Sequence, residues 1–183
     1  MPRVNQSQFA VLGLLSLGPM SGYDLKQLIA WSVGHFWREG YGQIYPTLQR
    51  LEKQHLVTRK TQRQTGKPDR NVYSLTSEGR ERLKQWLSEQ ASPEVPRNEL
   101  LLKLFFGHGV PGAMSRGQVE HYRRRWKEQL IEYAGVRKRL FQENSPDNPG
   151  LPFWEITLSY GEHIAKAQLA WSDETLKKLK NVE

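Results

Sequence analysis

The chain has 183 residues, of which 37% are hydrophobic and 25% charged, and its formal net charge is +8. It contains no cysteine, which excludes disulfide bonds, thiol nucleophiles and thiolate zinc sites. No apolar run approaches the roughly 18 residues of a membrane span, and the first residues lack the apolar stretch of a signal peptide, so we expect a cytoplasmic protein that does not enter the membrane.

The positive charge is concentrated in the first half of the chain. Residues 1–90 carry 13 Lys and Arg against 7 Asp and Glu, and the segment 43–70 alone carries 7 against 2. Focused positive charge is typical of a surface that binds nucleic acid. A surface that only keeps the protein in solution can have the same composition.

The beginning of the chain predicts two helices. The first is the apolar run 9–17, which ends at a Gly-Pro pair that is typical of a turn. Ser21 to Asp24 has the sequence of a capping box, in which two side chains bond the free backbone amides of a helix start. Apolar residues then recur at spacings of three and four from Leu25 to Phe36, which predicts the second helix.

A third helix is predicted from Gln43 to about His55. Ile44, Leu48 and Leu51 share its inner face because they recur at helical spacing. Pro46 is tolerated because it lies in the first turn, where its missing N–H has no helical partner. The side chains expected to face outward are Gln43, Tyr45, Thr47, Gln49 and Arg50.

A β-hairpin is predicted next, from strands over about 56–62 and 70–75. Both segments are rich in β-branched or aromatic residues, and the turn between them contains Gly and Pro. Arg63, Lys67 and Arg70 lie at or beside this turn, so the hairpin has a basic tip. A capped helix follows and ends near Ser92, where prolines mark a boundary between domains at 1–92 and 93–183.

The second domain is predicted to be helical. A short apolar helix covers Glu99 to Phe106, and a capping box at Ser115 to Gln118 is expected to open a long helix. That helix carries heptads with Val119, Trp126, Tyr133 and Leu140 at one core position and Tyr122, Gln129 and Val136 at the other. After a turn over 144–150, a last helix repeats the period through Phe153, Ile156, Tyr160, Ile164, Ala167 and Trp171.

These heptads can pack within one chain or across a dimer, and we expect a homodimer built on the second domain. The fold class is therefore mainly α with a small β-hairpin wing, a winged helix-turn-helix domain followed by a helical C-terminal domain. The third helix would read base edges in a major groove of double-stranded DNA. The wing would reach backbone phosphates beside that groove.

Two alternatives remain open at this stage. The polar face of the third helix can be a solvated surface, with the winged-helix domain used for protein or RNA contacts. The chain can also sense a ligand without binding an operator. An enzyme is disfavoured because the histidines lack metal-ligand spacing and no phosphate-binding glycine loop is present, so we predict no catalytic residue, no metal site and no cofactor.

Three segments resemble the PadR family of transcriptional regulators: residues 21–25 (SGYDL), 42–52 (GQIYPTLQRLE) and 69–79 (DRNVYSLTSEG). The resemblance covers about residues 8–90, and residues 99–107 more weakly resemble the start of the C-terminal helical domain of the longer PadR subfamily. It implies a repressor that dimerises through its C-terminal helices. It also implies that the operator would be faced by Tyr23, Gln43, Tyr45, Pro46 and Arg50. An aromatic residue early in a helix, such as Tyr23, is also typical of packing.

A small aromatic effector is a further expectation, because some PadR proteins sense such compounds. Aromatic residues gather in the second half of the chain, and a flat ligand suits aromatic walls. We expect His163 to lie on an apolar seam, where its ring nitrogens would need a partner. The candidate pocket consists of Trp126, Trp154, Tyr160, His163 and Trp171. Core packing of the same residues is the alternative.

Overall fold

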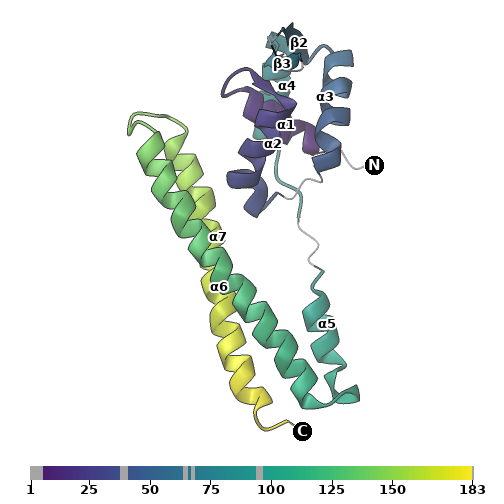
Figure 1. Cartoon of the computed structure of the whole chain (residues 1–183), viewed down its shortest axis with the longest axis vertical. Helices are drawn as coiled ribbons and strands as arrows, with labels where there is room; N and C mark the ends of the chain where they lie inside the picture. Colours follow the sequence, from purple (N-terminus) through teal and green to yellow (C-terminus); the bar gives the residue numbers. More distant parts are fainter. Residues whose placement is uncertain (1–5, 38–40, 64–65, 67–68, 94–96, 183) are drawn as a thin grey trace. The chain divides into compact units, whose positions relative to one another are not determined.

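The structure is a computed structural model that describes residues 6–37, 41–63, 66, 69–93 and 97–182. The chain divides into two compact units, Met1–Ser92 and Pro93–Glu183 (Figure 1). The elements of the first are α1 (Ser7–Leu15), β1 (Met20–Ser21), α2 (Gly22–Trp31), the 3₁₀ turns η1 (Val33–His35) and η2 (Tyr41–Gln43), α3 (Ile44–Lys53), β2 (Val57–Gln62), β3 (Arg70–Leu75) and α4 (Ser77–Ser88). Those of the second are α5 (Glu99–Phe105), η3 (Gly107–Gly109), α6 (Gly112–Glu143) and α7 (Leu151–Leu179).

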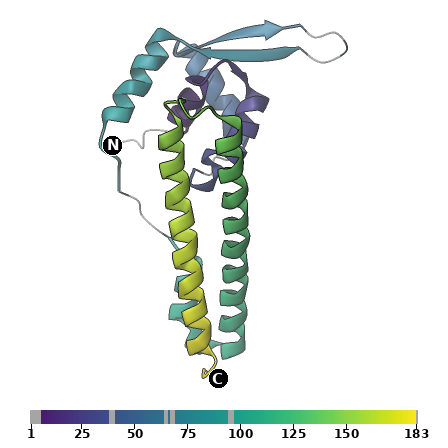
Figure 2. The ribbon, with the colours of Figure 1, turned by 90° about the vertical axis from the view of Figure 1, so that its left-hand side faces the viewer.

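The first unit confirms the predicted order of three helices, a hairpin and a capped helix. Its sheet is antiparallel with the strand order β1-β3-β2, and the β2–β3 hairpin runs in register from Val57 opposite Leu75 to Gln62 opposite Arg70 (Figure 2). The two-residue strand β1 was not predicted. The second helix is shorter than expected and ends at Trp31.

Apolar side chains from all of these helices form one core in the first unit. Buried leucines and Phe9 on α1 pack with the inner sides of α2 and α3. The Phe9 ring stacks on Trp86 of α4 with 4.5 Å between ring centroids. Burial of these side chains is the main force that fixes α3, and therefore its outward face, on the rest of the unit.

Gly79, in the first turn of α4, allows that helix to approach the hairpin closely. A Cβ atom there would lie 2.1 Å from the carbonyl oxygen of Leu56. We expect Gly79→Ala to destabilise the protein by about 1–3 kcal/mol, because backbone must move to relieve the clash. Gly117→Ala is the matched control, since a Cβ at this α6 position meets no atom within 4 Å and alanine favours helix by about 0.5–1 kcal/mol. Chemical denaturation that showed equal stability for both variants would refute this packing.

The second unit is an antiparallel pair of long helices, α6 and α7, beside the short α5 (Figure 1). The predicted heptad seam of α6 is confirmed: Val119, Tyr133 and Leu140 are buried, and Trp126 is partly buried. The predicted capping box at Ser115 is wrong, because α6 begins one turn earlier at Gly112 and Ser115 is a buried residue within the helix.

The inner face predicted for the last helix is confirmed at Trp171, which contacts the Tyr122 ring of α6, but is wrong at the start of the helix. The side chains of α7 that are buried against α6 are Leu151, Leu158, Ala165 and Ser172, which repeat every seven residues. Phe153, Ile156 and Tyr160 instead lie on the exposed side, where Phe153 is 70% exposed. Within the described residues, no helix is both long and apolar enough to cross a bilayer.

Candidate nucleic-acid interface

The outward face of α3 is polar and aromatic. Ile44, Leu48 and Leu51 are buried as predicted. The side chains of Gln43, Tyr45, Pro46 and Gln49 are exposed, and Arg50 is partly exposed. This exposed face places hydrogen-bonding groups at the N-terminal end of the helix, the part that meets base edges in helix-turn-helix proteins.

Thr47 does not belong to this face, so the prediction that it faces outward is wrong. Its side chain is 1% exposed, because position 47 lies one turn after Ile44 and one turn before Leu51 on the inner side of α3. The Thr47 hydroxyl accepts a hydrogen bond from Nη2 of Arg50 at 3.3 Å. Thr47 therefore helps to orient Arg50 rather than facing solvent.

Tyr45 lies against the start of α2. A Cβ atom at Gly22 would lie 2.6 Å from Cε1 of the Tyr45 ring, so a larger residue at position 22 would force that ring to shift. Tyr45 nevertheless remains 56% exposed. The contact fixes one side of the ring while its remaining surface stays available to a partner.

Tyr23 lies in the first turn of α2 and is 61% exposed, so it is not packed in the core. Its hydroxyl accepts a hydrogen bond of 2.5 Å from Nε2 of Gln27, one turn along the same helix. The hydroxyl can still donate to a second partner, such as a phosphate oxygen.

The wing brings fewer free cations to this region than predicted. Arg63 is exposed at the end of β2, whereas Lys67 lies outside the described residues. Arg70, the first residue of β3, forms an ion pair with Asp24 of α2. The predicted free guanidinium at the tip is thus engaged within the protein.

Asp24 completes the capping box that was predicted for α2. Its Oδ2 atom accepts hydrogen bonds from the backbone N–H of Ser21 at 2.8 Å, from the Ser21 hydroxyl at 2.9 Å and from Arg70. Partial burial alone would raise the pKa of Asp24, but the hydrogen bonds from Ser21 and Arg70 outweigh it and lower the pKa. Asp24 is therefore ionised at neutral pH.

Sequence reasoning missed two cations in this region. Lys53 is exposed one turn beyond Gln49 on the same side of α3, and Lys60 is exposed on β2. The spacing of four between Gln49 and Lys53 was the available signal. Arg59 is less free than either, because its Nε is 3.0 Å from a carboxylate oxygen of Glu52.

The five residues predicted to line one effector pocket do not come together. Trp126 and Trp171 each make an edge contact with the Tyr122 ring, with centroids 6.0 Å and 5.9 Å apart. Trp154 packs near the other end of the helix pair, about 25 Å from Trp171 along α7 at 1.5 Å per residue. Tyr160 is exposed.

His163 is exposed as well, so the expectation that it is buried on an apolar seam is wrong. Its Nδ1 atom lies 2.7 Å from the carbonyl oxygen of Ser159, so that ring nitrogen already has a partner within α7. A ligand is not needed to satisfy it.

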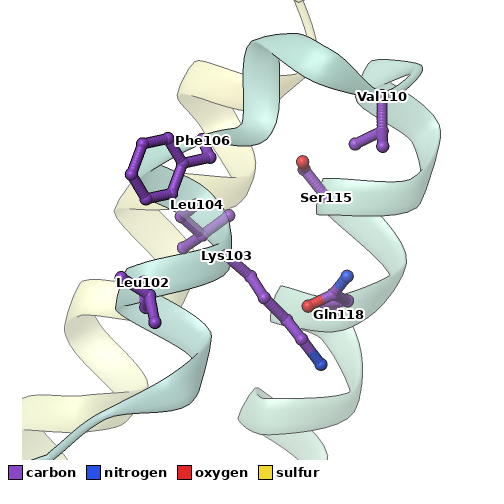
Figure 3. Close-up of a pocket in the computed structure, with 7 residues that line it drawn as sticks. All are labelled: Leu102, Lys103, Leu104, Phe106, Val110, Ser115 and Gln118. Carbon is purple, nitrogen blue, oxygen red and sulfur yellow. The ribbon is translucent and has the colours of Figure 1, made fainter.

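A pocket of about 390 Å³ lies elsewhere in the second unit, between α5 and the start of α6 (Figure 3). None of its lining residues belongs to the predicted effector set. They are Leu102, Lys103, Leu104, Phe106, Val110, Ser115 and Gln118.

Known proteins resemble this chain over nearly its whole length. Residues 11–85 match the model of the transcriptional regulator PadR-like family, and residues 96–180 match that of the virulence activator alpha C-terminal domain. A probable transcriptional regulator of Mycobacterium tuberculosis is 30% identical over 93% of this chain and 95% of its own length. The negative transcriptional regulator PadR of Bacillus subtilis is 37% identical over 54% of this chain, a match that spans 55% of that protein.

Solved structures agree with the sequence matches. The crystal structure of B. subtilis PadR in complex with operator DNA is similar with a TM-score of 0.84 and 26% identity, and the match covers 96% of this chain and 98% of that one. The same protein in complex with p-coumaric acid has a TM-score of 0.75, also at 26% identity, over 95% of this chain and 98% of that one. These relatives are transcriptional regulators and not enzymes, which confirms the function class predicted from the sequence. The chain therefore belongs to the PadR-like family of transcriptional regulators.

Proposed function

We propose that this protein is a cytoplasmic repressor that binds a palindromic operator as a homodimer. The observation that carries the proposal is the exposed polar face of α3, held by a buried apolar face and flanked by the wing. In this arrangement Gln43, Tyr45, Pro46, Gln49 and Arg50 would face bases or phosphates at the start of the helix, and Tyr23 would contact the backbone. Similarity to a relative that was solved in complex with operator DNA supports operator binding by this chain.

Exposed apolar side chains in the second unit support the homodimer. No residue of α5 is buried, although five of its seven residues are Leu or Phe, and Phe105 is 79% exposed. The outer side of α7 exposes Phe153, Ile156 and Tyr160. Monomeric proteins rarely leave so much apolar surface in water. A second copy that covers these side chains would bury them, and the resulting dimer would carry two DNA-binding domains to one DNA duplex.

A small aromatic effector is part of the proposal. The support is the complex of B. subtilis PadR with p-coumaric acid, together with the Trp126–Tyr122–Trp171 ring cluster. We expect a phenolic acid that binds near this cluster to quench tryptophan fluorescence, and to lower operator affinity only if it binds the DNA-free form more tightly. Quenching that survives in Trp126→Ala, with operator affinity unchanged by the compound, would remove these rings from the site.

The test of operator binding is a gel shift with genomic fragments taken from beside the protein's own gene. We expect one fragment to shift at protein concentrations that leave fragments from within coding regions free. Base-specific contact predicts that an excess of random DNA does not compete for this fragment. If every fragment shifts at the same concentration, or none shifts, the protein is not an operator-binding regulator.

The wing is expected to contact phosphates through Arg63. Replacing Arg63 by Ala should flatten the dependence of log affinity on log salt by about one unit, because one phosphate contact and its released counterion are lost. Arg80→Ala, which removes an exposed cation from α4, is the control and should leave the slope unchanged. An equal slope for Arg63→Ala and the wild type would place the wing away from DNA.

A further inference from the structure

Asp24 joins β1 and the start of α2, which are adjacent in the chain, to β3, which is distant in the sequence. It lies in the first turn of α2, its Oδ2 atom bonds Ser21 of β1, and the same oxygen accepts from the guanidinium of Arg70 at the start of β3, 46 residues away. Ser21 in turn pairs with Val72 of β3. The carboxylate therefore ties the loop end of the wing to the helix that presents Tyr23.

The position of this ion pair matters more than its strength. Both side chains are partly exposed, and a pair in that setting adds little to the stability of the fold. Arg70 is also the first residue of β3, opposite Gln62 at the end of β2, so it lies at the loop end of the hairpin. Holding this residue limits how far the wing can swing relative to α2.

From this geometry we propose that Asp24 is a positioning residue for DNA binding, which acts by holding Arg70 and the loop end of the wing in the orientation that DNA requires. The inference rests on the proposed operator binding. The proposal predicts a change in DNA affinity of the opposite sign to the one expected from the charge of Asp24 alone. A carboxylate near DNA repels phosphates, so removing its charge should strengthen binding if the charge were all that mattered. If Asp24 positions the wing, removing it should weaken binding.

The competing interpretation is that Arg70 binds a phosphate directly and Asp24 merely occupies it in the free protein. In that case Asp24→Asn would free the guanidinium and tighten binding to any duplex. Arg70→Ala would then lower the salt slope by about 0.9 unit for the lost phosphate contact. The two interpretations therefore predict opposite signs for one variant and different slopes for the other.

The experiment measures the dissociation constant of the full-length protein for its operator by fluorescence anisotropy, at several salt concentrations. The variants are Asp24→Asn, Arg70→Ala, the double variant and Asp69→Asn. Asp69→Asn is the matched control, because Asp69 is an exposed acid next to Arg70 in the chain and forms no ion pair among the described residues. It removes the same charge without touching the Asp24–Arg70 pair.

We expect Asp24→Asn and Arg70→Ala each to weaken operator binding about three- to tenfold. Without the ion pair, the wing must be ordered when DNA binds, and this ordering costs binding free energy. The double variant should be no weaker than either single variant, because both lose the same link. The salt slope should stay at the wild-type value in all of them. Asp69→Asn should bind at least as tightly as the wild type.

Unchanged or tighter binding by Asp24→Asn, while the wild type binds its operator, would overturn the positioning role and leave the proposed function intact. If the wild type shows no preference for the operator, both the positioning role and the proposed function are rejected. Should Asp24→Asn lower the thermal midpoint by more than about 5 °C, Arg70→Gln decides the question, because this side chain lies outside the helix cap. It should weaken binding without changing the salt slope, and unchanged affinity would overturn the proposal.

Discussion

Removal of residues 93–183 is expected to weaken binding to an operator with two half-sites by about 10²- to 10⁴-fold. In the dimer, binding of one DNA-binding domain holds the second at a high effective concentration near its half-site. The first unit has its own core, so the shortened chain should fold and bind a single half-site weakly. Sedimentation should show it as a monomer and the full chain as a dimer. A shortened chain that remained dimeric would contradict the assignment of the interface to the second unit.

A point variant tests the same interface in the full chain. Ile156→Asp places a charge on the exposed face of α7, where the side chain makes no contribution to the α6–α7 core. It should favour monomers while leaving helix content unchanged by circular dichroism. Lys166→Asp is the control, since Lys166 is an exposed polar residue on the same helix, and it should remain dimeric.

Replacing Gln49 by Ala is expected to reduce the discrimination between operator and random DNA by about 1–3 kcal/mol, the range for a side chain that bonds a base edge in the major groove. Gln49 is exposed one turn after Tyr45 on the outward side of α3 and packs against no part of the core. Binding constants for the two duplexes, measured side by side, give the discrimination directly.

Two lysine variants distinguish base recognition from non-specific attraction to the DNA phosphates. Lys53→Ala should weaken binding to both duplexes alike, because its ammonium is expected to meet a phosphate. Lys84→Ala, on the exposed side of α4, should change the affinity for neither duplex.

Equal discrimination between operator and random DNA by Gln49→Ala and the wild type would show that this face of α3 does not read bases.

The buried side of α3 was predictable because three apolar residues recur at helical spacing. Thr47 was misplaced because its polarity was given more weight than its position, and the period of 3.6 places it between Ile44 and Leu51 on the inner side. On α7 the error was the reverse, because exposed apolar residues were predicted to be buried. Phe153, Ile156 and Tyr160 were taken as part of the inner face, whereas the smaller Ala165 and Ser172 lie against α6.

The α7 error has a physical origin. A helix that is apolar on two sides can pack one side within the chain and leave the other for a partner, and periodicity alone does not say which. The effector residues were separated for a related reason, because the register of the α6–α7 pair decides which rings meet. The Asp24–Arg70 pair joins residues 46 positions apart, and β1 is only two residues long, so neither produces a local pattern.

The most direct test of operator binding by this protein is the affinity of the full-length chain for its operator and for a shuffled duplex of the same composition, between about 50 and 200 mM salt. Sequence-specific binding predicts that the operator is bound at least about 10³-fold more tightly at physiological salt, and that affinity for both duplexes falls steeply as salt rises. Equal affinity for the two duplexes at every salt concentration would contradict it.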